Sequence, residues 1–304
     1  MAKASFTLSD GSKVTTVTEK EEVNKPDDFS VDAFVSELKD DLKHNRLKLP
    51  TMPTIAIEAL MVLNDVDSSA GDLVKVISKD TSLTARLIRY ANSPLYGMAY
   101  PIASIKPAIT CIGFQKVKHA IYAVCMKDVF RTSVSDIQRR MEGLWEHSVK
   151  VASKAVALAR PHPGLDPEVA LVAGLVHDIG KIPLLIKLCD YEALVEYPEF
   201  VDHLLYRLHT GMGKAILQSW DFDPALVAVA AEHENIKRKP QGQSPDYVDV
   251  VQAANILSYG GTGHPLADIA RDKIGAFARL GIGEGQGADD HGHAGGDGIE
   301  EAVS

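Results

Sequence analysis

The sequence predicts an all-α protein built from a dozen or more short helices. Apolar residues recur at helical spacing through most of the chain, and capping residues repeatedly precede these apolar stripes. No segment shows the alternation of polar and apolar residues that a half-buried strand would need. The chain also lacks a repeat of fixed period. We therefore expect many short helices rather than a simple bundle.

Capping residues mark the helices of the first half. Ser30, Ser69 and Asp80 each stand ahead of an apolar stripe, and an acid three residues after Ser69 completes a capping box. Breaks that contain proline, at 49–53 and 92–94, separate these helices. Further helices are expected over 55–63, 105–112 and 114–130.

The second half repeats this pattern. Asp166-Pro167 and Asp223-Pro224 each combine a capping acid with a proline at the first helical position, so each should begin a helix. The helix after Asp166 runs through an apolar stretch and should end near Gly180. Long helices are also expected over 137–158 and 247–259.

We expect one folded domain with two extensions. Residues 1–29 are rich in Thr, Lys, Glu and Asp and are interpreted as a flexible arm, with a short extended piece near Lys13. Residues 283–304 are rich in Gly, Asp and His and are interpreted as a disordered tail. The domain between them, 30–282, should consist of an N-terminal lobe over 30–134 and a second lobe over 135–282.

Composition limits the classes of function. The 304 residues are 45% hydrophobic and 24% charged, as in an ordinary globular protein. A net charge of −9 argues against general binding to nucleic acid or to an anionic membrane. Three scattered cysteines, no apolar leader at the start and no obvious membrane span indicate a cytoplasmic protein.

The run Gly174–Lys181 carries the clearest chemical signal. It places His177 and Asp178 together at the end of an apolar stretch, where an unpartnered polar group is costly. A single buried histidine is more often a hydrogen-bonded core residue than a ligand, and that interpretation stays open here. Three further histidines on other helices favour a shared divalent metal: His147, His209 and His233.

The order of these residues resembles the HD superfamily of metal-dependent phosphohydrolases. The similarity lies in 145–148, in 173–181 and in 209–213, and the last of these resembles the HD-GYP branch. Residues 232–234 are similar to the His-His-Glu segment of that branch, with its first His replaced. The resemblance implies that Lys181 lies near a substrate phosphate. It also implies that a divalent metal (Fe, Mn, Zn or Mg) is held by His147, His177, Asp178, His209 and His233.

Two departures from the HD pattern affect the expected function. HD enzymes close the metal site with a late Asp, and Asn255 stands in the matching position here. A neutral amide binds a divalent cation less well than a carboxylate. The Gly-Tyr-Pro segment of the HD-GYP branch is absent as well, so its cyclic dinucleotide substrate is not implied.

The first half resembles the HDOD domain, a signalling relative of the HD proteins. The similarity runs from about residue 38 to 260 and lies in 49–53, 80–93, 102–109 and 112–114. It implies a bacterial regulatory protein that acts through a protein partner or a nucleotide ligand, without catalysis. A metal-dependent phosphohydrolase acting on a nucleotide or cyclic dinucleotide is the alternative. Three polar residues at helical spacing form a candidate phosphate- or partner-binding face: Arg86, Arg89 and Asn92.

Overall fold

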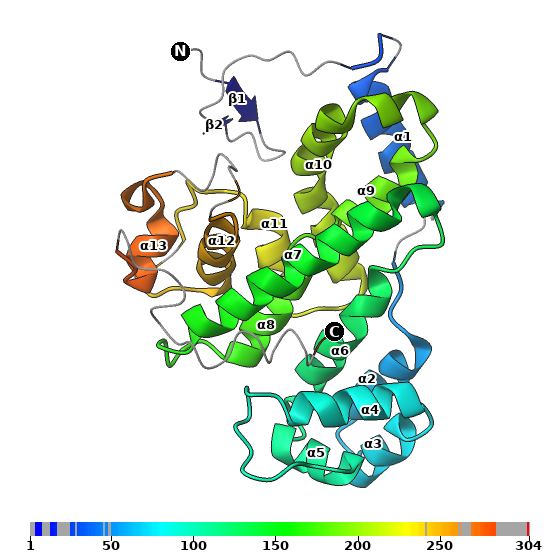
Figure 1. The fold of residues 1–304 in the computed structure, drawn as a ribbon, viewed down its shortest axis with the longest axis vertical. Coiled ribbons are helices and arrows are strands. Elements are labelled where there is room, and N and C mark those ends of the chain that lie inside the picture. Colours follow the sequence, from blue (N-terminus) through cyan, green and yellow to red (C-terminus); the bar gives the residue numbers. More distant parts are fainter. Residues whose placement is uncertain are drawn as a thin grey trace.

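The computed structural model confirms an all-α fold with two lobes (Figure 1). The lower lobe contains α2 to α5, the upper lobe contains α7 to α13, and α6 lies between them. The structure describes residues 4–7, 13–16, 25–27, 29–44, 46–47, 50–240, 242–260, 262, 269–283 and 303. The expected tail lies almost wholly outside these residues, as does most of the expected N-terminal arm.

The described part of the chain contains thirteen α-helices, two 3₁₀-helices and one short hairpin. The hairpin pairs β1 with β2 in antiparallel register, with Ala4 opposite Thr16, and its second strand coincides with the extended piece expected near Lys13. The strands are β1 (Ala4–Thr7) and β2 (Lys13–Thr16). The helices are α1 (Val31–Lys43), α2 (Thr54–Asn64), α3 (Ala70–Ile77), α4 (Thr81–Ala91), α5 (Ile105–Ile112), α6 (Val117–Val129), α7 (Ser135–Ala159), α8 (Pro167–Val176), α9 (Lys181–Leu188), η1 (Glu192–Glu196), α10 (Pro198–Ser219), α11 (Pro224–Glu232), α12 (Tyr247–Ser258), η3 (Arg271–Lys273) and α13 (Gly275–Leu280).

The expected caps form as the sequence predicts. The side chains of Ser30 and Asp80 accept hydrogen bonds from main-chain N–H groups in the first turns of α1 and α4. Ser69 and its partner acid make a full capping box on α3. Asp166 and Asp223 cap α8 and α11, each followed by its proline. These local interactions satisfy N–H groups that a helix start would otherwise leave unpaired.

Helix α1 departs from the expected division into lobes, because it packs on the second lobe (Figure 1). Phe34 lies edge-on to Tyr191, and Phe29 lies edge-on to both Tyr191 and Phe200. Lys187 of α9 also pairs with an acid of α1, Glu37, at 2.6 Å. These contacts join segments about 150 residues apart. Hydrophobic periodicity within α1 does not reveal which surface will bury it.

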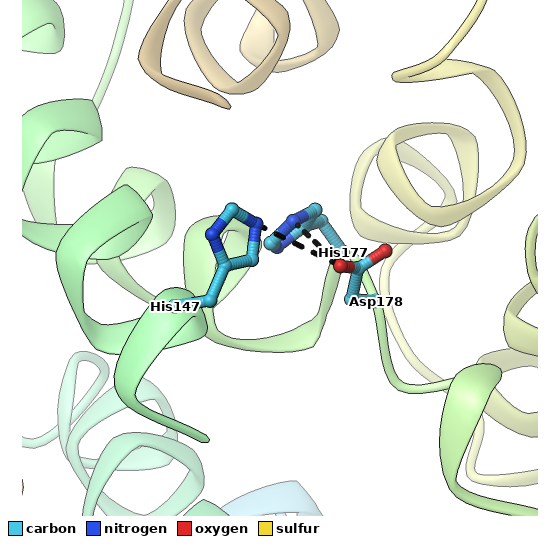
Figure 2. Close-up of side chains that lie close together, drawn as sticks. All are labelled: His147, His177 and Asp178. Atoms are coloured by element: carbon cyan, nitrogen blue, oxygen red, sulfur yellow. Dashed lines mark ion pairs between the residues drawn. The ribbon is translucent and has the colours of Figure 1, made fainter. Parts of the chain in front are cut away.

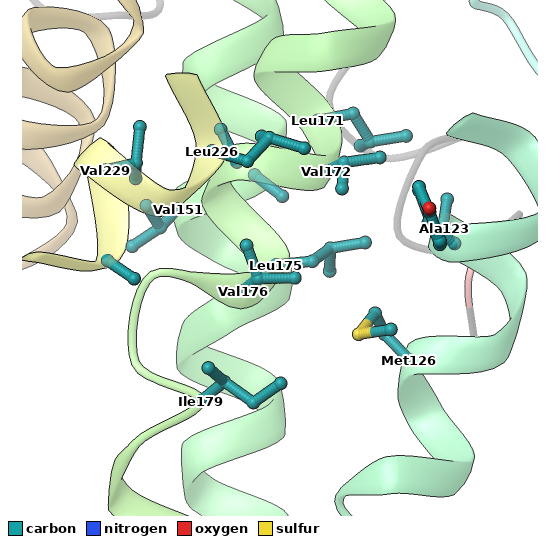
Figure 3. Packing of buried hydrophobic residues seen from close by; sticks show 14 of the residues in the cluster. Ala123, Met126, Val151, Leu171, Val172, Leu175, Val176, Ile179, Leu226 and Val229 are labelled. Atoms are coloured by element: carbon teal, nitrogen blue, oxygen red, sulfur yellow. The ribbon is translucent and has the colours of Figure 1, made fainter. Parts of the chain in front are cut away.

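One continuous apolar core spans both lobes. Figure 3 shows α8 side chains between those of α6, α7 and α11, with Ala123 and Met126 on the α6 side. Helices α7 and α8 approach closely at Gly174, where a Cβ atom would lie 2.4 Å from Ala152 Cα. The glycine therefore allows the backbones of these two helices to meet.

One described segment, Pro167–Leu188, is long and apolar enough to cross a membrane by length and composition, although the sequence predicts no apolar run of that length. It comprises α8, the turn after it and α9. Its most apolar window is 83% buried inside the protein. The segment therefore forms part of the core.

The end of α10 offers a test of backbone strain. Asp221 has φ of 54°, in the left-handed region, and the N–H of Phe222 donates to the carbonyl of Leu217. Glycine adopts this conformation without steric cost, and its lack of charge also suits a helix C-terminus. We expect Asp221→Gly to raise the free energy of unfolding by about 0.5 kcal/mol. Urea denaturation measures the change, and Asp221→Asn separates charge from strain. An unchanged or lower midpoint in Asp221→Gly contradicts the prediction.

Candidate metal centre

Five predicted side chains from four parts of the chain meet in one pocket. His177 and Asp178 occupy the turn between α8 and α9, and His147 projects from α7 (Figure 2). His209 lies within α10, and His233 directly follows α11. All of them except His147 are almost completely buried. The grouping expected from the HD resemblance is therefore present in the structure.

The carboxylate of Asp178 lies at the centre of the group. Its Oδ1 is 3.3 Å from Nε2 of His209 and 3.5 Å from Nε2 of His233. Its Oδ2 is 3.4 Å from Nε2 of His177 and 3.7 Å from Nε2 of His147. The two oxygens thus face two different pairs of histidines. We call Asp178 with His147 and His177 the first half-site, and Asp178 with His209 and His233 the second half-site.

Main-chain carbonyls orient three of the histidines. Nδ1 of His177 lies 2.7 Å from the carbonyl oxygen of Gly174, and Nδ1 of His233 lies 3.0 Å from that of Val229. Nδ1 of His209 lies 2.9 Å from the carbonyl oxygen of Leu205. A carbonyl oxygen only accepts, so each Nδ1 donates its proton. In its neutral form, such a ring presents its Nε2 lone pair to the pocket, as metal-ligating histidines do.

Burial and charge set the protonation of these groups. Burial, with His177 nearby, lowers the pKa of His147 to about 3, and burial lowers that of His209 to about 3. Burial opposes the charged form of His233 as well, but Asp178 and a neighbouring acid outweigh it and raise the pKa. Burial likewise opposes ionisation of Asp178, but Lys181 and His177 hold its pKa well below the usual range. The pocket thus contains an ionised carboxylate and two imidazoles, those of His147 and His209, that burial keeps neutral.

Several polar atoms in the pocket are buried without a hydrogen-bond partner. They include Nε2 of His147, Nε2 of His177 and Oδ1 of Asp178. The Nε2 atoms of His209 and His233 also face each other at 3.2 Å, a contact that needs a proton or a cation between two lone pairs. Such unpaired groups are costly in a buried site. The residues present therefore fit a divalent metal.

Lys181 and Asn255 complete the surroundings of the pocket. Nζ of Lys181 lies 2.5 Å from Oδ2 of Asp178. Asn255 is buried on α12, and its side chain hydrogen-bonds to Tyr259, whose ring stacks on that of His147. Oδ1 of Asn255 is buried and has no hydrogen-bond partner among the residues that the structure describes.

A second close approach fixes the distance between His209 and Asp178. A Cβ atom at Gly180 would lie 2.0 Å from the carbonyl oxygen of His209 and 2.5 Å from the N of Gly213. Only a glycine lets the turn after α8 lie directly against α10. The sequence predicts that Gly180 ends a helix, but α8 already ends at Val176 and Gly180 directly precedes α9, so the glycine is needed for this close approach instead.

The three residues considered as a phosphate- or partner-binding face lie apart from this pocket, on and after α4. Arg86 donates to the carbonyl oxygen of Val124 and pairs with Asp128 at 2.7 Å, so it joins α4 to α6. Asn92 exchanges hydrogen bonds with the main chain of Ile102. Arg89 is exposed. The side chains of Arg86 and Asn92 thus make hydrogen bonds within the protein. Of the three residues, Arg89 remains exposed for contact with a phosphate or a partner.

Sequence reasoning did not assign a role to two residues at the pocket. Oε1 of Glu234 lies 3.6 Å from Nε2 of His233, and Tyr259 covers His147. Glu234 directly follows the predicted ligand His233 in the segment similar to His-His-Glu. Tyr259 comes one helical turn after Asn255, the residue that matches the closing Asp of HD enzymes. That proximity in sequence was the available signal for both.

The family model of the HDOD domain matches residues 49–236, more than half of the chain. This protein belongs to the HDOD family. The matched segment includes four histidines of the pocket and Asp178, while Asn255 lies beyond it. The expected resemblance is confirmed at this level.

Solved structures share the fold. A protein of Shewanella amazonensis SB2B, described as a "Putative metal-dependent phosphohydrolase", is 26% identical with a TM-score of 0.74, and the match covers 90% of this chain and 97% of that one. An HDOD domain protein with unknown function from Geobacter sulfurreducens is 25% identical with a TM-score of 0.57, over 90% and 93% of the chains. A "Putative signal transduction protein" of Marinobacter aquaeolei VT8, at 18% identity and a TM-score of 0.58, shows the fold alone, over 90% of this chain and 64% of that one.

Two curated relatives match over part of their length. An uncharacterized protein of Treponema pallidum is 25% identical over 68% of this chain, and the match covers 42% of that relative. Ribonuclease Y of Opitutus terrae is 35% identical over 32% of this chain, which is 15% of that enzyme. This chain therefore spans less than half the length of the curated relatives it matches.

Proposed function

We propose that this HDOD protein is a metal-binding signalling module of the cytoplasm that acts through a protein partner or a phosphorylated ligand, without turnover. The observation that carries the proposal is the pair of half-sites that share Asp178. In each half-site the ligand atoms lie within 4.8 Å of one another, while one carboxylate, that of Asp178, belongs to both.

The limited charge of the pocket supports a role without catalysis. Lys181 offsets the charge of Asp178, and Asn255 adds none. Divalent ions in oxygen- and nitrogen-rich sites are held more tightly as carboxylates are added. A pocket with little net negative charge suits reversible binding of a metal together with an anionic ligand.

A second candidate is a metal-dependent phosphohydrolase. The number of ligands favours it, since five side chains are present, as does the likeness to the Shewanella amazonensis protein. A divalent ion bound here would supply Lewis-acid chemistry for hydrolysis of a phosphate ester. In that case Lys181, which pairs with Asp178, would offset negative charge that develops on the phosphate.

Metal analysis followed by an activity screen tests both candidates. We expect protein purified without a tag from metal-replete cells to contain at least one divalent ion per chain by elemental analysis. With Mn²⁺ or Fe²⁺ added, we expect no hydrolysis of nucleotides, cyclic dinucleotides or simple phosphodiesters. Hydrolysis that His177→Ala abolishes, and that the exposed-site control His44→Ala retains, replaces the first candidate by the second. Protein that binds no divalent ion even after titration contradicts both.

A further inference from the structure

The second half-site lacks negative charge unless a further acid takes part. Asp178 is shared between the two half-sites, and the ammonium of Lys181 lies 2.5 Å from one of its oxygens. The remaining ligands of the second half-site, His209 and His233, are neutral when they bind a metal. Asp178 and Lys181 together contribute no net charge. A divalent ion there would gain little electrostatic stabilisation.

Glu234 lies where it can supply this charge. Among the described residues, Asp178 and Glu234 are the two carboxylates within 4.0 Å of any ring nitrogen of the four pocket histidines. Oε1 of Glu234 is 3.6 Å from Nε2 of His233, the atom that faces Asp178. The side chain of Glu234 is 14% exposed, so it stands at the rim of the pocket.

The turn that carries Glu234 is fixed by neighbouring helices. Gln252 of α12 is buried and donates from Nε2 to the carbonyl oxygen of His233 at 3.1 Å. Arg238 pairs with Glu232 at 2.7 Å and with Asp246, which begins α12. The turn after α11 is therefore held on both sides, and a ligand on a rigid support loses little entropy when it binds.

We propose that Glu234 is a further metal ligand, whose carboxylate turns in from the rim of the pocket to join the group formed by Asp178, His209 and His233 when an ion binds. This assignment rests on the proposed metal-binding function. Two imidazoles and two carboxylates form a donor set suited to Mn²⁺, Fe²⁺ or Zn²⁺. The carboxylate of Glu234 then supplies the charge that Asn255 does not.

A purely structural role is the alternative. In that case Glu234 stabilises a protonated His233 in the metal-free protein and has no part in metal binding. The two roles differ in what they affect, because the structural role changes the stability of metal-free protein, while the ligand role changes the affinity for the metal.

Calorimetric titration with Mn²⁺ and with Zn²⁺ distinguishes the roles. We expect Glu234→Gln to weaken one binding event at least about tenfold relative to the wild-type protein. Glu232→Gln is the matched control, since it removes the same charge two residues away and leaves Arg238 paired with Asp246, the contact that holds the turn against α12. It should leave metal affinity within about twofold of wild type. Glu234→Asp, with a shorter side chain, should restore part of the affinity.

The outcomes separate this proposal from the function on which it rests. Equal metal affinity in Glu234→Gln and wild type contradicts the ligand role, and so does a change confined to the melting temperature of metal-free protein. Equal weakening in Glu232→Gln and Glu234→Gln contradicts it as well, since it indicates a general electrostatic effect. If the wild-type protein takes up neither ion, the metal-binding function itself is wrong.

Discussion

Replacing Asp178 by Asn is expected to remove metal from both half-sites at once. Its two oxygens face separate pairs of histidines, so this one carboxylate belongs to both. Asparagine keeps the shape of the side chain but removes its charge. We expect metal affinity to fall at least about 100-fold, beyond the effect of removing an outer neighbour of a metal site.

Stability must be separated from metal binding in this variant. Lys181 would be left near the pocket without its carboxylate partner, and an unpaired buried charge is destabilising in itself. Asp178→Asn combined with Lys181→Met removes both charges and should recover part of the stability, without recovering the metal. Elemental analysis and calorimetric titration report metal content, and urea denaturation of metal-free protein reports stability.

Asp249→Asn is the matched control. Asp249 is equally buried, on α12, and pairs with Arg238 and Arg279 away from the pocket histidines. The Asp249→Asn variant should be less stable than the wild-type protein and should bind the same amount of metal. Metal content in Asp178→Asn equal to that of wild type contradicts the shared role of Asp178, whatever happens to stability.

Much of the fold follows from local signals in the sequence. Ser69, Asp166 and Asp223 start helices where predicted, because capping depends on residues only two or three positions apart. The adjacent His177 and Asp178 also indicate a shared pocket, since two polar groups at the end of an apolar helix need a partner.

Contacts between segments far apart in the sequence could not be predicted from the pattern of neighbouring residues. Phe34 looks like an ordinary core residue of the first lobe, and only the folded chain shows it against Tyr191. Arg86 looks like a surface residue at helical spacing, yet its partner Asp128 lies 42 residues later. The proposed role of Glu234 in place of the acid missing at Asn255 also depends on how α11 meets α12.

Gly180→Ala should lower both stability and metal affinity, because one methyl group would collide with the backbone of α10. Its position lies 2.0 Å from the carbonyl oxygen of His209 and 2.5 Å from the N of Gly213. Neither atom belongs to a flexible side chain, so α10 must move away from the turn after α8. Steric overpacking of this kind costs about 3 kcal/mol of unfolding free energy.

The same displacement links stability to the site. His209 is carried by the segment of α10 that must move, and its Nε2 is now 3.3 Å from Oδ1 of Asp178. We therefore expect the second half-site to weaken more than the first. Urea denaturation of metal-free protein measures the stability, and titration with Mn²⁺ measures the affinity of each binding event.

Gly211→Ala provides the comparison within the same helix. A Cβ atom at Gly211 would meet nothing within 4 Å, and alanine favours a helix interior by about 0.5–1 kcal/mol over glycine. This control should be at least as stable as wild type and should bind metal equally well. If Gly180→Ala behaves like Gly211→Ala, then α10 tolerates displacement. The contact between the turn after α8 and α10 would then not determine the position of His209.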